Sequence, residues 1–553
     1  MNWVLEYAKQ IKSGKIITSK RVAAVYARLA EEIKYCDTHK RSKYVFDVSR
    51  GQHPIDFIER YCKQSEGEYG APIKLELFQK AFVMAAFGFL FRETGLRRFR
   101  EVMQLIARKN GKTTLLAALA LYMLMMDGEG AAKVYSVATK RGQAELAFNA
   151  AVDMRMHSPQ IAEITKKRRY DIYFPATSSV FEALASQSKT MDGLNVHMAI
   201  IDELHEIRDP NLYRVIKDGT VGRRQPMIMM ITTAGTRREN IYDQMYKYAC
   251  DVADGKVIDE GFLPILYELD DREEWTNEAA WIKANPGLGT IKQQDALREL
   301  VERARNIPGE LPNLLCKHFN CKANGPGAWL SYDDYKNDLT FTMEDVYDTY
   351  AIGGCDLSAT TDLTCATLLI RKPGDEITYV LQHYFIPEER VKIVEGSDDQ
   401  EAPYREWERK GLITINEGNR VDYRNVTSWF VEMQQLHEIT VHKVGYDRAL
   451  AGFWLEDMNA NGFDMEQVVQ GMYTWSQPMK ELGAALQDKK INYNQNKILF
   501  WCMNNTGCKK AGTLENIQPV KLEEKRRIDG TVSLLNAYTV YIRDYEDFMN
   551  KVG

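Results

Sequence analysis

The amino-acid sequence predicts an α/β protein with two large domains. The chain has 553 residues, and a single hydrophobic core rarely extends beyond roughly 250–300 residues. In the first half, short apolar runs alternate with helical patterns, which is typical of a mostly parallel sheet flanked by helices. In the second half, apolar runs follow one another with only turn residues between them, which predicts an antiparallel meander in a second α/β domain.

The expected domain organisation follows from changes in these patterns along the chain. Residues 1–70 show helical spacing and form a helical N-terminal lead-in, and residues 71–325 form the first α/β domain with a helical subdomain at its end. A Gly-Pro-Gly break at 325–327 accompanies a linker, 326–349, and residues 350–553 form the second domain. Strands are expected at 101–106, 133–138, 198–201 and 227–231 in the first domain, and at 351–356, 363–370, 377–383, 440–447 and 467–470 in the second.

Composition restricts the class of protein. Hydrophobic residues make up 45% of the chain and charged residues 27%, as in an ordinary globular protein. The longest apolar runs, 81–91 and 115–126, are shorter than the roughly 18–20 residues that span a bilayer, so we expect buried helices there. Glu6 and Lys9 interrupt the apolar N-terminus, which indicates no signal peptide and a cytoplasmic protein. Nine cysteines without Cys-x-x-Cys pairing favour reduced thiols over disulfides or structural zinc.

The charge balance argues against a protein that coats nucleic acid. The formal net charge is −5 at pH 7, whereas such proteins carry a strongly basic surface. Any contact with DNA is therefore expected to be local. The candidates are three basic runs, 97–100, 166–169 and 525–527, each of which could equally be a solvated surface.

A phosphate-loop-like turn follows the first expected strand. Residues 107–114 read Ala-Arg-Lys-Asn-Gly-Lys-Thr-Thr and precede an apolar helix pattern. In such loops, backbone N–H groups and a helix N-terminus hold phosphates, the lysine meets the β/γ oxygens, and the hydroxyl holds Mg²⁺. The first glycine of the usual motif is replaced by Ile106. Taken alone, the turn is either a nucleotide site or a lysine-bearing helix start.

Two further strand ends support a P-loop NTPase-type domain. Asp202 and Glu203 end one buried run, where an ATPase needs a carboxylate for Mg²⁺ and another to orient water. The residues Thr232 to Gly235 close the next run, and parallel strand ends gather at one edge. Gln79, next to Phe78, precedes the first strand as a candidate for adenine recognition or as an ordinary helix-surface glutamine. The predicted ATP site comprises Phe78, Gln79, Arg108, Lys109, Asn110, Gly111, Lys112, Thr113 and Thr114.

The second domain carries acids at corresponding positions. Asp356 ends one strand, Asp447 ends another, and Asp529 begins the last long helix. Phosphodiester hydrolysis uses two cations roughly 3.5–4 Å apart, held by several carboxylates. The order strand-acid, meander, strand-acid, helix-acid indicates an RNase H-like α/β nuclease domain. Asp529 is also a good helix cap, and Asp362 lies in a threonine-rich turn where Asp is common. Without a histidine cluster, Mg²⁺ or Mn²⁺ is favoured over zinc.

These residues lie in segments that resemble a known family. The chain is similar to the large terminase subunits of tailed double-stranded DNA bacteriophages, phage- or prophage-encoded motor-nucleases that package viral genomes. The resemblance covers most of the chain and keeps the family's order. It rests on ARKNGKTT, ATKRGQA, DGLNVHMAIIDELHE, ITTAG, WIKANPGLG, GCDLSATTDLT, YFIPEE, YREWERKGLITINEGNRVDY, VGYDR and RIDGTVSLLNAY.

For the ATPase, the resemblance implies a role for each matched residue. Lys112 and Thr113 would bind ATP phosphates and Mg²⁺, Asp202 would hold the metal, and Glu203 would activate water. It also implies a tolerated missing glycine and a charge-stabilising role in cis for Arg108. Coupling of hydrolysis to movement would fall to Thr232, Thr233, Ala234 and Gly235, and a finger reaching a neighbouring subunit would be Arg223 or Arg224.

For the nuclease, the resemblance implies a metal triad. Asp356, Asp447 and Asp529 would hold two Mg²⁺ or Mn²⁺ ions, with Asp362 as an accessory ligand. The middle acid is open, because parts of the family use a glutamate on another strand. Asp422 or Glu417 would then replace Asp447.

The resemblance also implies a function and partners. The protein would use ATP and Mg²⁺ to move double-stranded DNA into a procapsid, and would cut concatemeric DNA when packaging starts and ends. Its partners would be DNA, a small terminase subunit, the portal protein and further copies in a ring, expected to be a pentamer. It would act in the host cytoplasm, docked transiently on the procapsid.

Three alternatives remain at this point. A host helicase or translocase would use the ATPase residues but leave the acids Asp356, Asp447 and Asp529 without a role. An RNase H-like recombinase or resolvase would use the acids and carry an ancillary nucleotide-binding domain. A degenerate prophage remnant would act only as a binding protein, although its lysine and acids are intact.

Overall fold

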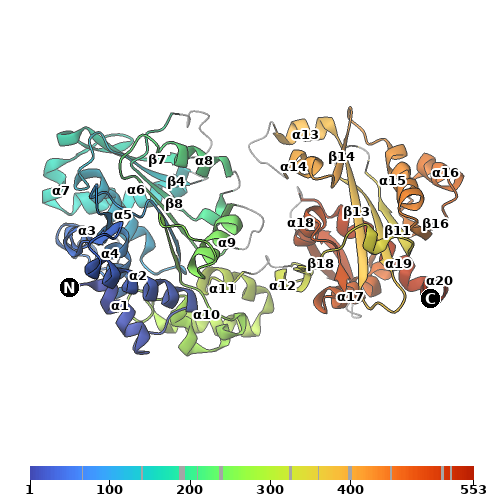
Figure 1. Cartoon of the computed structure of the whole chain (residues 1–553), viewed down its shortest axis with the longest axis horizontal. Coiled ribbons are helices and arrows are strands. Elements are labelled where there is room, and N and C mark those ends of the chain that lie inside the picture. Colours follow the sequence, from blue (N-terminus) through green and yellow to red (C-terminus); the bar gives the residue numbers. More distant parts are fainter. Residues whose placement is uncertain are drawn as a thin grey trace. The chain divides into compact units, whose positions relative to one another are not determined.

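The computed structural model divides the chain into two compact units, Met1–Ala323 and Asn324–Gly553, which are described one at a time (Figure 1). No helix among the described residues is both long and apolar enough to cross a bilayer. All nine cysteines are free thiols. The structure describes residues 1–64, 67–138, 141–185, 193–207, 210–235, 241–322, 327–358, 360, 362–395, 402–448, 451–511, 516–522 and 526–553.

The N-terminal segment is helical, as expected, and packs into the first unit. Ser19 caps one of its helices, because its Oγ accepts a hydrogen bond from the N–H of Val22 at 3.2 Å. Short strands pair antiparallel beside the helices, β1 (Tyr44–Phe46) with β2 (Phe89–Phe91). The helices are α1 (Trp3–Lys12), α2 (Lys20–Thr38), α3 (Val48–Tyr61) and α4 (Leu77–Gly88).

The first unit is built on an eight-stranded sheet whose larger part is parallel, which confirms the predicted fold class. The strands lie in the order β10-β3-β9-β8-β4-β7-β6-β5. Neighbours from β10 to β7 run parallel, and β6 and β5 are antiparallel. Their bounds are β3 (Glu101–Leu105), β4 (Lys133–Ala138), β5 (Lys166–Lys167), β6 (Asp171–Phe174), β7 (Ser179–Ala185), β8 (Met198–Asp202), β9 (Met227–Thr232) and β10 (Phe262–Leu266).

Helices cover both faces of this sheet (Figure 1). The long apolar run after the phosphate loop forms α5 (Lys112–Met125), and every residue from Leu115 to its end is buried. A helix that is apolar all round requires this position between other elements. The others are α6 (Arg141–Met156), α7 (Pro159–Ile164), α8 (Pro210–Asp218), α9 (Ile241–Ala253), α10 (Gln294–Asn306) and α11 (Leu311–His318).

The second unit contains the expected meander. β11, β12 and β13 pair antiparallel in sequence order, while β15 runs parallel to β11 and β16 parallel to β15. The strand order is β14-β13-β12-β11-β15-β16, with β17 beside β13. The bounds are β11 (Tyr350–Asp356), β12 (Thr364–Arg371), β13 (Thr378–Pro387), β14 (Ile413–Asn416), β15 (Thr440–Tyr446), β16 (Met465–Gln467) and β17 (Ile491–Asn492).

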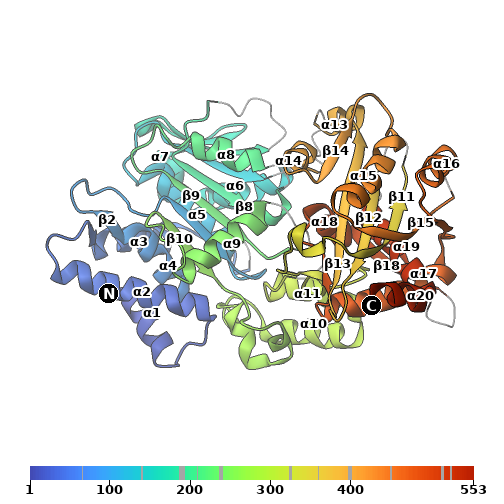
Figure 2. The same ribbon diagram turned by 45° about the vertical axis from the view of Figure 1, so that its right-hand side comes forward.

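Two adjacent glycines of β11 set the helices on opposite faces of this sheet. A Cβ on Gly353 would meet Phe430 of α15 at 3.2 Å, and one on Gly354 would meet the Ser533 carbonyl of α19 at 2.4 Å. Successive residues of a strand point to opposite faces, so α15 and α19 cover different sides of the sheet (Figure 2). The elements besides the sheet are α12 (Tyr332–Tyr335), α13 (Glu388–Glu395), α14 (Tyr404–Arg409), α15 (Tyr423–Leu436), α16 (Gly452–Ala460), α17 (Met472–Gln487), α18 (Lys497–Asn505), the hairpin β18 (Thr506–Ala511) and β19 (Asn516–Lys521), α19 (Asp529–Arg543) and α20 (Tyr545–Val552).

The expected linker, 326–349, carries side chains that pack into the second unit. Tyr335 is buried in its core, and Trp329, Leu330 and Tyr332 pack against the same cluster. The short helix α12 contacts α17. The domain boundaries drawn from the sequence remain a proposal, and part of this linker belongs to the folded second unit.

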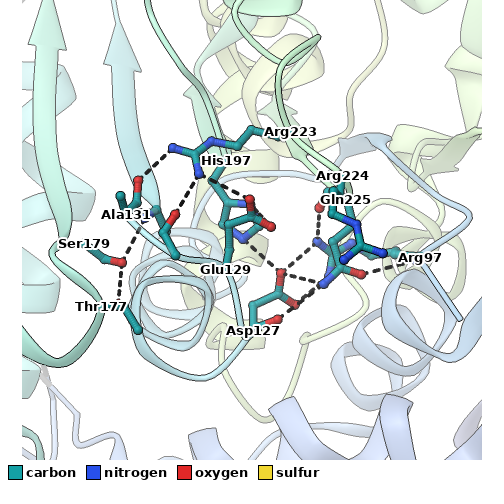
Figure 3. A network of polar contacts seen from close by, with 12 residues as sticks. Arg97, Asp127, Glu129, Ala131, Thr177, Ser179, His197, Arg223, Arg224 and Gln225 are labelled. Atoms are coloured by element: carbon teal, nitrogen blue, oxygen red, sulfur yellow. Dashed lines mark hydrogen bonds and ion pairs between the residues drawn. The ribbon is translucent and has the colours of Figure 1, made fainter. Parts of the chain in front are cut away.

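A buried charge network ties together the amino ends of the strands in the first unit (Figure 3). Arg97 forms two hydrogen bonds to Asp127, at 2.8 and 3.1 Å. His197, just before β8, contacts the same carboxylate at 2.9 Å. The neighbouring Arg98 pairs with Glu32. The proposal that this end of the basic run 97–100 contacts DNA is therefore wrong, because both arginines are buried in internal ion pairs.

The network is electrostatically favourable at neutral pH. Burial disfavours the charge of Asp127, but Arg97 and His197 outweigh it and lower the pKa of Asp127 from 3.8 to about 2. A carboxylate whose pKa is lower in the folded state stabilises the fold at pH values above its ordinary pKa. This contribution is lost as the pH falls through about 2.

We expect Asp127→Asn to lower the free energy of unfolding of the first unit by about 3–5 kcal/mol, because the amide leaves buried Arg97 without a counter-charge. Urea unfolding followed by circular dichroism measures the change. Glu302→Gln, which breaks an exposed pair with Arg305, is the matched control and should leave the unfolding midpoint nearly unchanged. Equal stability of Asp127→Asn and the unaltered protein would contradict the assignment.

Candidate active sites

The phosphate loop forms without the usual first glycine. The Ile106 N–H donates to the Thr232 carbonyl at 3.1 Å, so this residue extends the pairing of β3 with β9, and its side chain is buried. The left-handed backbone positions fall later, at Lys109 (φ 64°) and Gly111 (φ 77°). A glycine is therefore unnecessary at position 106, because the chain turns after it.

The acid pair lies at the same sheet edge as the loop. Asp202 ends β8, is buried, and its Oδ1 accepts a hydrogen bond from the N–H of Glu203 at 2.9 Å. Glu203 Oε1 lies 3.5 Å from Lys112 Nζ. The Glu203 backbone is left-handed, with φ 52°, a strain that is typical of functional positions. The structure thus brings the predicted lysine and both acids together.

The pKa values of Asp202 and Glu203 are shifted in opposite directions. Burial and the neighbouring Glu203 charge raise the pKa of Asp202, although Lys112 opposes them. Burial also disfavours the charge of Glu203, but Lys112, His205 and Arg108 outweigh burial and lower its pKa. Paired acids with opposite shifts are suited to different roles.

His205 connects the acid pair to the predicted coupling turn. Its Nδ1 lies 2.9 Å from Thr232 Oγ1 and 3.2 Å from Glu203 Oε2. A Cβ on Gly235 would come within 2.3 Å of the His205 ring, so only glycine fits there. Thr232, Thr233 and Ala234 are fully buried and can act only through neighbours. The sequence reasoning missed His205, although it stands in the acid motif itself.

The other predicted ATP-binding residues occupy different environments. Phe78 is buried and packs edge-on against Tyr267, so adenine stacking would require the ring to become accessible. Gln79 accepts a hydrogen bond from the N–H of Glu76 at 3.0 Å, and its Nε2 lies 3.3 Å from the Cβ position of Gly111. Lys109 is exposed, and Thr113 and Thr114 are half-buried in the first turn of α5. Their ligand contacts remain predictions.

The predicted arginines differ in position. Arg108 is half-buried in the loop, and its charge reaches Glu203. Arg223 pairs with Glu129 at 3.2 Å and donates to the Ala131 carbonyl at 2.7 Å (Figure 3). It precedes β9 and so lies at the amino edge of the sheet, opposite the phosphate loop. Arg224 is exposed. A role for either in a neighbouring subunit remains a prediction, and Arg223 would first have to leave its internal pair.

The three nuclease acids converge in the second unit. Cys355 and Tyr446 are partners across β11 and β15, so the next residues, Asp356 and Asp447, lie side by side at the strand ends. Asp529, the first residue of α19, is buried, and its Oδ2 has no hydrogen-bond partner among the described residues.

Repulsion between these acids marks a site suited to cations. Burial and the charges of Asp529, Asp447 and Asp362 raise the pKa of Asp356 well above its ordinary value. Burial and Asp362 raise the pKa of Asp529 to about 7, against Lys521 and Arg527. As they stand, no three His, Cys, Asp or Glu side chains among the described residues are close enough to enclose a metal ion. The buried, unsatisfied oxygen and the raised pKa values nevertheless fit divalent cations.

Close packing of α19 brings Asp529 to this edge. A Cβ on Gly445 of β15 would lie 2.7 Å from the Asn536 carbonyl of α19. Gly354 of β11 is in the same situation, because a Cβ there would also clash with α19. Ser533 Oγ donates to the Gly354 carbonyl at 3.1 Å, and Asn536 Nδ2 to the Cys355 carbonyl at 2.9 Å. Glycines in the strands and short polar side chains on the helix therefore fix the helix start beside the strand ends.

The alternatives for the middle acid lie elsewhere. Asp422 caps α15 by accepting from the Arg424 N–H at 3.1 Å, and it pairs with the Arg424 side chain. Glu417 is exposed just after β14, which lies three strands from β11. The geometry therefore favours Asp447, which follows the strand next to β11.

Asp362 and Gln470 complete the surroundings of Asp356. Asp362 pairs with Lys521 at 3.0 Å and with Arg527, so one end of the third basic run contacts an acid. Lys525 of that run lies outside the described residues. Gln470 Nε2 contacts Asp356 Oδ1 at 3.4 Å. The sequence offered no signal for Gln470, because a glutamine after a short strand is common.

A phosphate-loop sheet joined to a sheet edged with carboxylates defines a two-domain hydrolase. Residues 77–251 match the terminase large subunit ATPase domain, and residues 256–544 match the terminase large subunit endonuclease domain. The chain belongs to the terminase large subunit family, which confirms the resemblance read from its motifs. These domains imply the use of a nucleotide and a divalent metal.

The chain is also similar to individual proteins. The large terminase subunit of Enterobacteria phage HK97 is 26% identical over 496 residues, which span 88% of this chain and 94% of that protein. Protein YmfN of Escherichia coli (strain K12) is 28% identical over 356 residues, 63% of this chain and 77% of that protein. The crystal structure of the HK97 large terminase covers 89% of this chain and 99% of its own, with 24% identity and a TM-score of 0.47.

The sequence match and the structure divide the chain differently. The endonuclease match begins at residue 256, whereas β10 (Phe262–Leu266) pairs with β3 at the edge of the first sheet. Residues 256–322 therefore belong to the first unit of the structure. This segment also contains the WIKANPGLG motif, to which the sequence reasoning assigned no role.

We expect Gly354→Ala to destabilise the second unit by about 1–3 kcal/mol, because a new methyl group displaces α19 from β11. DNA cleavage should fall with it, since Asp529 moves away from Asp356. Thermal unfolding and a plasmid-nicking assay measure the two effects. Gly452→Ala, whose new methyl group meets open space, is the matched control and should retain both properties. Full cleavage by Gly354→Ala would contradict the role of this close packing.

Proposed function

We propose that the protein uses ATP hydrolysis to move double-stranded DNA into a procapsid and a separate metal-dependent site to cut concatemeric DNA at the start and end of packaging. The observation that carries the proposal is that one terminase chain has two chemically different sets of side chains at two sheet edges. Lys112 with Asp202 and Glu203 suits a nucleotide, and Asp356 with Asp447 and Asp529 suits cations beside a phosphodiester. A helicase would use only the first site, and a recombinase mainly the second.

In the ATPase unit, the phosphate loop binds the triphosphate. Lys112 Nζ is buried without a hydrogen-bond partner among the described residues, and the α5 N-terminus faces the loop, so both fit an anion. Asp202 and Thr113 hold Mg²⁺, which supplies charge stabilisation at the phosphates. Glu203 stays ionised and orients the attacking water. Arg108 stabilises the negative charge that develops on the phosphates during hydrolysis. Its position supports this role, because its charge acts on Glu203 at the same site.

In the nuclease unit, the carboxylates hold two Mg²⁺ or Mn²⁺ ions. When bound, the ions supply charge stabilisation to the attacking and leaving oxygens of the phosphodiester. The ligands are Asp356, Asp447 and Asp529. Asp362 is an accessory acid that forms ion pairs with Lys521 and Arg527. Gln470 orients Asp356 through its amide group.

The partners follow from this activity. The motor acts as a ring of identical chains, a pentamer, docked on the portal protein of the procapsid in the host cytoplasm. A small terminase subunit selects the DNA. A net charge of −5 suits a motor that must release the DNA backbone in every cycle, since tight phosphate binding would hold it.

Substitutions at the two sites should have reciprocal effects. Lys112→Ala should abolish DNA-stimulated ATP hydrolysis and spare metal-dependent cleavage, because it removes only the phosphate ligand. Asp356→Asn should reduce cleavage by at least about 100-fold, by analogy with the loss of other groups that stabilise charge in a transition state, and spare ATP hydrolysis. Phosphate release and plasmid nicking with Mg²⁺ or Mn²⁺ measure these activities.

The motor itself needs a packaging assay with proheads, portal and DNA. Both variants should fail to produce filled heads, whereas Lys256→Ala, an exposed lysine outside both sites, should package normally. Cleavage that persists in Asp356→Asn combined with Asp529→Asn would overturn the nuclease assignment. Packaging by Lys112→Ala would overturn the ATP-driven motor.

We expect His205→Ala to lower the turnover number of ATP hydrolysis by about 10–100-fold, the usual cost of removing a group that orients a catalytic residue. Nucleotide affinity should change little, because His205 contacts Glu203 of the acid pair and Thr232 of the coupling turn. Stopped-flow binding and steady-state kinetics separate these quantities. His39→Ala, at an exposed helix end, is the control. A loss of affinity with unchanged turnover would contradict the orienting role.

A further inference from the structure

The WIKANPGLG motif folds over the phosphate loop. Ile291 approaches the Cβ position of Gly111 at 3.5 Å, and Gly287 lies close enough that its own Cβ would be 3.3 Å from Asn110 Oδ1. The Gly287 N–H donates to that Asn110 oxygen at 3.1 Å. The Ala107 N–H donates to the Ala284 carbonyl at 3.3 Å. We call residues 284–292 the clasp.

Asn110 and Asn285 join the clasp to the inside of the loop. Asn110 Nδ2 donates to the Ala107 carbonyl at 3.0 Å and to Asn285 Oδ1 at 3.1 Å. Both asparagines are buried. Asn285 is held in turn, because its Nδ2 donates to the His318 carbonyl at 2.8 Å. Asn110 therefore shapes the loop from within, and its amide group is already engaged before a nucleotide binds.

Lys292 ends this chain of contacts in an unusual environment. Its side chain is buried, with 6% exposed, and its Nζ donates to Asn285 Oδ1 at 2.6 Å and to His318 Nδ1 at 3.1 Å. Both acceptors are neutral. Asn285 carries an amide group, and the pKa of His318 is lowered to about 3 by burial and by the charges of Lys292, Arg108 and Lys317. Within the described residues, no carboxylate pairs with this ammonium group.

Among the described residues, the charged groups that act on Lys292 and on its partner His318 are basic. The charge of Lys112, in α5, acts on Lys292. The charges of Lys292, of Arg108 in the loop and of Lys317 in α11 act on its partner His318. Burial, and then Lys112, lowers the pKa of Lys292 from 10.5 to about 7. A second buried lysine beside the phosphate lysine therefore lacks a counter-charge, which an anion at the loop would supply.

We propose that Lys292 is a positioning residue of the nucleotide site: its ammonium group holds the phosphate loop in shape through Asn285 and Asn110 and takes the phosphates of a bound nucleotide as its counter-charge. Nucleotide binding is then coupled to the charge of Lys292. The inference rests on the proposed ATP site and deepens it. It adds Lys292 of the clasp to the phosphate-loop residues that are proposed to bind the nucleotide.

The sign of the coupling follows from linkage. Without nucleotide, Lys292 is mostly neutral above about pH 7. Phosphate charge nearby favours its protonated form, so binding takes up a proton in alkaline solution. Affinity should therefore fall as the pH rises above 7, by at most about tenfold per pH unit.

Isothermal titration calorimetry of the full chain tests this coupling. Mg²⁺ and a non-hydrolysable ATP analogue are titrated at pH 8.5 in two buffers of different ionisation enthalpy, which gives the number of protons taken up. We expect close to one proton for the unaltered protein and none for Lys292→Met, with about tenfold weaker binding by that variant. Lys292→Arg, which keeps its charge at every pH, should bind without proton uptake and with a flat pH dependence.

Matched variants make the outcomes distinct. Lys283→Met alters a lysine just before the clasp that pairs with Asp270 and Glu274, and it should keep the proton uptake. Lys112→Ala should lose binding itself. Absence of binding by the unaltered protein would refute the proposed ATP site, whereas binding without proton uptake, or equal affinity and pH dependence in Lys292→Met, would overturn this inference alone. The measurement on the unaltered protein decides the question even where a variant fails to fold.

Discussion

A parallel sheet delivers the last residue of every strand to the same edge, and both candidate active sites depend on this constraint. In the first unit, β9 lies between β3 and β8, so the phosphate loop, the turn after Thr232 and the acid pair meet although they are far apart in the sequence. In the second unit, the parallel pairing of β11 with β15 places Asp356 beside Asp447. Strand order and direction thus create both sites, and side-chain contacts then refine them.

The two sites have opposite electrostatic character. Around the phosphate loop, Lys112, Lys292 and Arg108 bring several positive charges together, and Lys112 and Arg108 act on Glu203 of the acid pair. At the nuclease edge, Asp529 is buried and Asp356 is half-buried next to other acids, and the pKa values of both rise. Each site holds like charges together at a cost in stability, which the rest of the fold must offset. Such arrangements are stabilised by a ligand of the opposite charge, phosphate in one case and divalent cations in the other.

The sequence predicted the parts of each site that follow a local rule. An apolar run that ends in an acid located Asp202 and Asp356, because strand ends and buried runs are visible in one dimension. Residues whose role depends on a distant element left no such signal. His205 matters because of Thr232, and Lys292 because of Asn110. The run 97–100 was one of three candidates for a local DNA contact, yet Asp127 and Glu32, far away in sequence, make Arg97 and Arg98 internal.

The fold shows the same division between local and distant information. The strands that carry the site residues were predicted to within a few residues, since their apolar patterns are continuous, and the meander β11 to β13 followed from close spacing. The shorter or edge strands β1, β2, β5, β6, β7, β14 and β17 were not predicted. β10 was missed, because its place beside β3 depends on a crossover through the whole first sheet. The hairpin of β18 and β19 was missed as well, since its strands carry polar residues. Pairing partners are a property of the folded chain, and single-sequence periodicity does not contain them.

The position of β10 beside β3 explains why the clasp lies over the phosphate loop. Because β10 joins the sheet next to β3, the chain that follows it must pass over the loop that follows β3, and residues 284–292 do so. The same segment continues into α11, whose last residue, His318, contacts Lys292, and the first unit ends soon after it. Through Asn285 and His318, Lys292 thus links the phosphate loop to the end of α11 within the first unit.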